Sequence, residues 1–305
     1  MSPTASRPDL ASARVGVIGG SGLYSINNLE SVEEVSTDTP FGPPSDALRV
    51  GTLNGVEVVF LARHGRQHHL IPSEVPYRAN IWAMRSLNVR WLISLSAVGS
   101  LQEHLRPRDM LVPDQLIDRT IGRPQTFFGE GCVAHVSLAD PFCPKLSELV
   151  ADAAASSLPE GQLLHRGGTY LCIEGPAFSS RAESELFRSW GCSVIGMTNH
   201  TEARLAREAE LAYASLSMVT DYDCWHQDHH AVTVGMVIAN LQANACATDP
   251  ILNRLMQRLN QERPESPAHS ALAEALVTSM DQVPAETRQR LDLLTSPYWG
   301  KWDQA

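Results

Sequence analysis

Cysteine motifs, long apolar runs and positive charge are all scarce in this 305-residue sequence. Its six cysteines are spread singly, with no CxxC pair and no zinc-ligand spacing, which argues against a disulfide scaffold or a zinc domain. No apolar run is long enough to cross a bilayer, and the first residues lack the apolar centre of a secretory signal. We therefore expect a cytoplasmic protein whose thiols stay reduced.

The charge balance limits the partners that this protein can have. Charged residues make up 19% of the sequence, and the formal net charge is -10. This balance argues against a nucleic acid or an anionic membrane as the main partner, although a local group of cations could still bind a phosphate. The hydrophobic fraction of 43% indicates a large packed core.

The order of predicted elements indicates one α/β domain. Apolar strands alternate with amphipathic helices from residue 75 to residue 219, without a linker or an internal repeat. We expect a flexible leader over residues 1–13 and the α/β domain over residues 14–262. Residues 263–305 form a C-terminal extension that we expect to pack on the same domain or on a neighbouring subunit.

Three segments carry specific predictions of secondary structure. A buried strand over residues 91–95 is expected to end in the segment Ser96–Ser100, and residues 109–117 are expected to form one further strand. Residues 233–259 have helical character, with a break expected near Asp249-Pro250 because proline removes a backbone donor.

Polar side chains gather where three predicted strands end, between Glu174 and Trp225. The three ends carry, in chain order, Ser179 and Ser180, then Met197 and Thr198, then Thr220, Asp221 and Asp223. Ligands of open α/β sheets bind at the carboxyl ends of the strands. We therefore expect one pocket here, for a mostly apolar ligand with a few polar edges.

A cluster of basic side chains follows the apolar run at residues 58–61. Arg63, His64, Arg66 and His68 belong to it, and arginine suits a phosphate because its planar fork offers paired donors. A metal site on the two histidines is an alternative, but the neighbouring arginines would repel a divalent cation. A solvated basic loop is the other alternative.

A glycine run after the first predicted strand is a second candidate for anion binding. Gly19-Gly20-Ser21-Gly22 could turn several backbone N–H groups toward an anion, or could form a simple tight turn. The run is not GxGxxG and lacks a Walker lysine, so it does not by itself indicate a nucleotide site.

These segments together resemble the trimeric purine nucleoside phosphorylase family, in its S-methyl-5'-thioadenosine phosphorylase branch. The resemblance covers about residues 15–237 and is carried by the blocks GVIGGSGLY, DTPFGPPSDAL, LARHGRQH, ANIWAMRSL, DPFCP, EGPAFSSRAES and TDYDCW. It implies a single α/β domain on a mixed sheet and a homotrimer, with a hexamer as the alternative. It also implies phosphorolysis of methylthioadenosine to adenine and 5-methylthioribose 1-phosphate, with inorganic phosphate as co-substrate and no metal or organic cofactor.

The resemblance implies roles for individual residues. The implied phosphate site is Ser21, Arg63, His64, Ser96, Ala97 and Thr198. The implied nucleoside site is Met197 at the ribose, Phe178 at the base, Asp221 and Asp223 at the adenine edge, Ser179 and Val234 setting the base and 5' preference, and His135 reaching over from a neighbouring subunit.

The two acids suit the chemistry that the resemblance implies. Breaking an N-glycosidic bond leaves negative charge on the purine, so we expect Asp221 to protonate N7. Burial beside Asp223 should raise the pKa of one acid of the pair, although the sequence does not say which one holds the proton. The pair also favours a 6-amino purine, because a 6-oxo group would place an acceptor against an acceptor.

Other activities remain open, and two segments depart from the pattern of the family. The chain could instead act on 6-oxopurine nucleosides or methylthioinosine, or bind purines without catalysis. At Asn199-His200-Thr201, before Glu202, the family often has a proline, and here Thr201 suits a helix N-cap. Residues 226–230 are rich in histidine, which leaves a metal site there as an alternative to an exposed loop.

Overall fold

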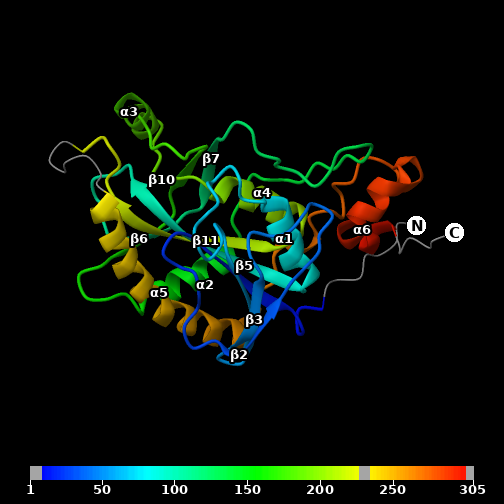
Figure 1. Cartoon of the computed structure of the whole chain (residues 1–305), viewed down its shortest axis with the longest axis horizontal. Coiled ribbons are helices and arrows are strands. Elements are labelled where there is room, and N and C mark those ends of the chain that lie inside the picture. The colour runs from blue at the N-terminus through cyan, green and yellow to red at the C-terminus, as the bar shows by residue number, and fades with distance from the viewer. Residues whose placement is uncertain (1–8, 227–233, 300–305) are drawn as a thin grey trace.

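One large mixed sheet forms the centre of the protein, with helices packed on both of its faces (Figure 1). The computed structural model describes residues 9–226 and 234–299, and gives only the backbone for residues 234–238. The strands are β1 (Arg14–Gly19), β2 (Glu30–Val35), β3 (Leu48–Leu53), β4 (Val56–Ala62), β5 (Val89–Ser100), β6 (Met110–Val112), β7 (Gln115–Arg119), β8 (Leu164–Arg166), β9 (Thr169–Ile173), β10 (Val194–Gly196) and β11 (Ala212–Asp221). The helices are α1 (Tyr77–Ser86), α2 (Pro144–Ala155), α3 (Arg181–Ser189), α4 (Asn199–Glu208), α5 (Val234–Glu262) and α6 (Ala285–Trp299).

The long strand β5 brings the ends of its neighbours together. It pairs in parallel with β1 and β11, and its last residues pair antiparallel with β10. Ile195 of β10 and Asp221 of β11 therefore both lie opposite Gly99. The carboxyl ends of β10 and β11 thus meet beside one short stretch of β5.

Alternating side chains of β1 pack into two different cores, one on each face of the sheet. Val15 and Val17 of β1 pack in the core under α2 and α5, whereas Ile18 packs in the core under α1, α4 and α6. This period of two is the pattern of a strand covered on both faces. The predicted α/β fold with a mixed central sheet is confirmed.

One prediction about strands is wrong. Residues 109–117 form two strands, β6 and β7, which separate at Pro113-Asp114 because they pair with different neighbours, β11 and β9. β5 ends in the expected segment, and it includes all of Ser96–Ser100 because its last residues gain β10 as a partner.

The predicted helix break at Asp249-Pro250 is also wrong. α5 continues through Pro250 although proline lacks the N–H that would bond one turn back. Ile251, Leu255 and Leu259 on its apolar side are buried in the core. Tertiary packing here outweighs the lost backbone bond.

The C-terminal segment packs on the same chain as far as residue 299. Leu291 and Leu294 of α6 are buried against the core under α1, and Tyr298 donates its hydroxyl proton to Glu210. Among the described residues, no helix is both long and apolar enough to cross a membrane.

Candidate functional site

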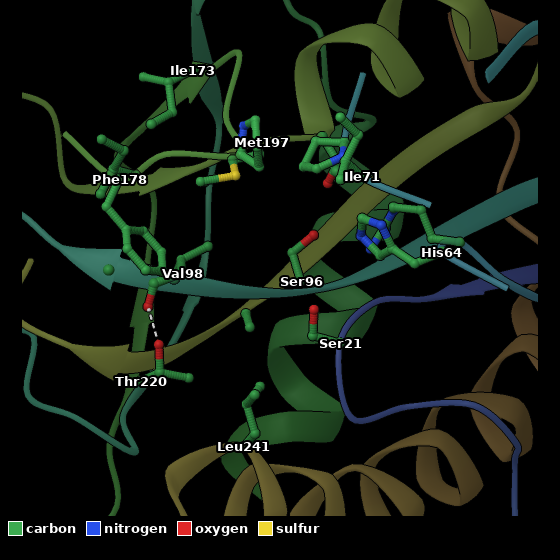
Figure 2. A pocket seen from close by; sticks show the side chains of 18 of the residues that line it. Ser21, His64, Ile71, Ser96, Val98, Ile173, Phe178, Met197, Thr220 and Leu241 are labelled. Carbon is green, nitrogen blue, oxygen red and sulfur yellow. Dashed lines mark hydrogen bonds between the residues drawn. The ribbon is translucent and has the colours of Figure 1, made fainter. Parts of the chain in front are cut away.

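A cavity of about 330 Å³ lies beside the last residues of strand β5, where β9, β10 and β11 end (Figure 2). It is lined by most of the predicted site residues, namely Ser21, Arg63, His64, Ser96, Ala97, Phe178, Ser179, Met197, Thr198, Asp221 and Asp223. Ser21, Ser96 and His64 gather at one end, while Phe178 and Thr220 lie at the other. The predicted phosphate and base regions therefore belong to one cavity.

Arg63 is buried and largely engaged with the protein itself. Its Nε donates to Glu202 Oε1 at 2.5 Å and its Nη2 to Glu202 Oε2 at 3.2 Å, while Ser94 and the Leu95 carbonyl accept at 2.7 and 3.2 Å. These contacts use four of the five guanidinium N–H groups. Burial disfavours the charge, but Glu202 more than offsets this and raises the pKa of Arg63. A Cβ at Gly20 would lie 2.5 Å from Nη1, so only glycine permits this packing.

Asn199, where the sequence departs from the family pattern, does not line the cavity but bonds to the lining residue Ser96. Its Oδ1 accepts a hydrogen bond from Ser96 at 2.8 Å, and its amide donates to Ser215 at 2.5 Å. Thr198, and not Thr201 as predicted, is the N-cap of α4, and Thr201 is buried in the first turn. The amino end of α4 thus faces the cavity, where its dipole favours an anion.

His64 is held neutral at the end of the cavity that the amino end of α4 faces. Its Nδ1 donates to the Leu70 carbonyl at 2.8 Å, which leaves Nε2 as an acceptor. Burial and the charge of Arg63 lower the pKa of His64 to about 4. The ring stacks on His68 with centroids 4.6 Å apart. Among the residues with described side chains, no three His, Cys, Asp or Glu groups converge as metal ligands.

The two acids are joined at the end of β11. The backbone N–H of Asp223 donates to Asp221 Oδ1 at 2.8 Å, and Thr220 Oγ1 lies 2.7 Å from Asp221 Oδ2. Ser184 of α3 donates to Asp223 Oδ2 at 2.5 Å. Burial raises the pKa of both carboxyl groups, and repulsion between the two carboxylates, which protonation of either one relieves, raises the pKa of Asp223 further. Such a pair can retain a proton near neutral pH.

Met197 and Phe178 form an apolar wall of the cavity, with Phe178 toward the end where Thr220 lies. A Cβ at Gly175, which has φ +67°, would lie 2.5 Å from Met197 Sδ, so glycine lets the loop after β9 pack on the thioether. Phe178, on the same loop, is 68% exposed at the cavity mouth. Both side chains therefore offer apolar surface to a ligand in the cavity.

Some predicted residues lie elsewhere. His135 is exposed outside the cavity, on a loop whose backbone N–H bonds the Ala275 carbonyl at 2.8 Å. Val234 starts α5, but its side chain is outside the described part of the chain, as are four residues of the histidine-rich stretch 226–230. Ser180 does not line the cavity; it caps α3 through a reciprocal bond with Glu183.

Comparison with known protein families decides the assignment of the chain. The family model described as "Phosphorylase superfamily" matches residues 14–293. The chain belongs to the phosphorylase superfamily. This match extends well beyond residue 237, where the resemblance read from the sequence stopped, and includes most of α6.

Similar members of the phosphorylase superfamily are named as methylthioadenosine phosphorylases. The S-methyl-5'-thioadenosine phosphorylase of Prochlorococcus marinus is 61% identical over 97% of this chain and 94% of that protein, and that of Geobacter sulfurreducens is 51% identical over 93% and 98%. A methylthioadenosine phosphorylase from an Antarctic soil metagenomic library is 50% identical with a TM-score of 0.88, covering 92% of this chain and 98% of that one. The Schistosoma mansoni enzyme, solved with adenine, is 36% identical with a TM-score of 0.76, covering 82% and 93%.

Sequence reasoning missed several residues around this phosphorylase site. Glu202 fixes Arg63, Ser184 holds Asp223, and Leu241 of α5 lines the cavity. Arg123 and Glu174 lie behind the apolar wall. The one available signal was the acid that ends the Asn199–Glu202 run, since a buried arginine needs an acidic partner.

Proposed function

We propose that this protein is an S-methyl-5'-thioadenosine phosphorylase, which converts methylthioadenosine and phosphate to adenine and 5-methylthioribose 1-phosphate. The observation that carries the proposal is a single cavity with a basic, hydroxyl-lined end and an acidic end. Arg63 and Ser21 mark the first end, Asp221 and Asp223 the second. The names of the similar proteins support the same activity.

The basic end suits the attacking phosphate. Arg63, the amino end of α4 and the hydroxyls of Ser21 and Ser96 surround the position where an anion is favoured. A phosphate oxygen forms a bond to C1' of the ribose as the C1'–N9 bond breaks, and the bonding electrons leave with the purine. The negative charge of phosphate stabilises the positive charge that develops on the sugar. His64 accepts a hydrogen bond at Nε2 from phosphate or from a sugar hydroxyl.

The acidic end suits the leaving adenine. Asp221 delivers its proton to N7 while the purine gains the electrons of the broken bond, so the base leaves neutral. The ionised partner, Asp223, accepts from the 6-amino group. Met197 lies under the ribose, where an unbranched thioether makes contact without requiring a hydrogen bond. Every group in this reaction comes from the chain or from the two substrates, so we propose no cofactor.

We also propose a homotrimer in which His135 of one subunit closes the cavity of the next. His135 is exposed and lies away from its own cavity, while the mouth of that cavity carries the exposed apolar side chains of Ile71 and Phe178. Ser179 and Val234 set the preference for base and 5' group.

All six cysteines are free, which fits a cytoplasmic enzyme. Its products suit purine and methionine salvage.

A comparison of substrates tests the proposed activity. The protein is assayed with methylthioadenosine, adenosine, methylthioinosine and inosine, each with phosphate. We expect methylthioadenosine to have the highest kcat/KM and the 6-oxo nucleosides to be lower by roughly 10⁴-fold, because the acid pair rejects their acceptor. Preference for methylthioinosine would make the protein a 6-oxopurine phosphorylase. Adenine binding without turnover of any nucleoside would make it a binding protein.

A further inference from the structure

Arg123 is a buried cation that lies behind the cavity and not in it. Its side chain is 1% exposed and does not line the cavity. It donates to the Glu174 carbonyl at 2.6 Å, to the Ile173 carbonyl at 3.4 Å and to the Met197 carbonyl. It also donates to Tyr77 Oη at 3.2 Å. One guanidinium therefore holds the ends of β9 and β10 at a fixed separation.

Glu174 completes the same arrangement from the other side. Its Oε1 accepts from Arg123 Nε at 3.2 Å and from the hydroxyl of Ser73, and its Oε2 accepts from the Ile121 N–H at 2.6 Å. Both oxygens of the carboxylate are thus occupied by donors from two separate loops. Glu174 does not line the cavity either.

The Arg123–Glu174 pair reaches three walls of the cavity. The first is Met197, through its carbonyl, and the second is the loop that follows Glu174 and carries Phe178. The third is the segment around Pro72, whose carbonyl accepts the Tyr77 hydroxyl proton at 2.9 Å. A shift of this pair would therefore move the sugar and base walls together.

We propose that Arg123 and Glu174 are positioning residues that set the nucleoside part of the cavity without touching the ligand, an inference that rests on the proposed function. A planar fork that serves three carbonyls, a phenol and a carboxylate is specific to arginine. Lysine would supply the charge but not the geometry. The phosphate end is held separately, by Glu202 and Asn199.

The test compares Arg123→Gln, Arg123→Lys and Glu174→Gln with the wild type in steady-state kinetics with both substrates. Losing charge-assisted bonds behind the wall should raise KM for methylthioadenosine about tenfold or more, while KM for phosphate changes less than about twofold. Arg123→Lys should not restore the nucleoside KM. Arg166→Gln is the matched control, since Arg166 is about half-exposed and pairs with Asp152 at 2.7 Å away from the cavity; it should match the wild type.

A binding measurement keeps this inference separate from the proposed function. Calorimetry with adenine should show about tenfold weaker binding to Arg123→Gln and Glu174→Gln than to the wild type, whether or not the protein turns over nucleoside. Wild-type nucleoside KM and adenine affinity in Arg123→Lys would overturn the inference. Equal losses in both KM values together with a lowered Tm in all three variants would also overturn it, because they would show a general effect on folding.

Discussion

Asp221 ends β11 with a carboxyl group whose pKa is raised by burial, so it retains its proton to higher pH than a free aspartate. Asp221→Asn removes the proton donor, and we expect kcat/KM for methylthioadenosine to fall at least about 100-fold. Wild-type activity should also fall as pH rises through the raised pKa, because the protonated form is lost there. The variant should lack that basic limb.

Asp152→Asn serves as the control for this prediction. Asp152 lies on α2, is partly exposed and pairs with surface arginines, so its loss should leave the pH profile unchanged. An Asp221→Asn enzyme with wild-type kcat/KM would remove Asp221 from the mechanism.

Glu202 is the residue on which the orientation of Arg63 depends. Glu202→Gln leaves a buried guanidinium without its countercharge, a change that typically costs about 3–5 kcal/mol of folding stability. We expect a lower Tm and a KM for phosphate raised several-fold, measured by calorimetry and by kinetics at saturating nucleoside. Glu57 gives the control, because it is exposed and pairs with Arg14 at 3.1 Å, so Glu57→Gln should change neither the Tm nor the KM for phosphate.

The polar residues at the strand ends were predictable, whereas their supports were not. Asp221, Met197 and Thr198 follow apolar strands in the sequence, and strand ends are where ligands bind. Arg123 lies in a loop with no neighbouring motif, and its partners come from residues about 50 and 74 positions away. A sequence pattern carries no signal for such long-range pairing.

At the scale of elements, α6 is expected to contribute to the stability of the domain. Leu291 is fully buried in the core under α1, so Leu291→Ala should lower the free energy of unfolding by about 2–5 kcal/mol. Urea unfolding measures this, and Leu293→Ala, a partly buried neighbour, should cost clearly less. An unchanged midpoint for Leu291→Ala would mean that residues 285–299 do not pack on this domain.

Element types were easier to predict than element limits. The apolar run at residues 58–61 lies within β4, and the alternation of elements expected from residue 75 begins with α1. β2 and β3 were not predicted. The residues of β2, Glu30–Val35, are acidic and show no apolar alternation, and almost all of them are exposed in the structure. Only pairing with β4 through β3 makes this edge a strand.

At the scale of the whole molecule, two buried histidines link stability to pH. The pKa values of His64 and His269 are lowered to about 4, mainly by burial, so the folded state binds fewer protons there than the unfolded state. Each should therefore remove about 2 kcal/mol of stability between pH 7 and pH 5, as the unfolded histidine is protonated.

Unfolding free energies at these two pH values test the linkage. His269 lies outside the site. Between pH 7 and pH 5 the free energy of unfolding of His269→Gln should therefore fall by about 2 kcal/mol less than that of the wild type. Equal losses in the two proteins would show that His269 is not buried in its neutral form.

The proposed reaction requires one cavity that holds an anion beneath a sugar and a proton beside its purine. The most direct measurement is to incubate the protein with methylthioadenosine, with and without phosphate, and to identify the products by ³¹P NMR and mass spectrometry. We expect adenine and 5-methylthioribose 1-phosphate in equal amounts, and no adenine when phosphate is omitted. Release of adenine with free methylthioribose and no uptake of phosphate would contradict the proposed reaction.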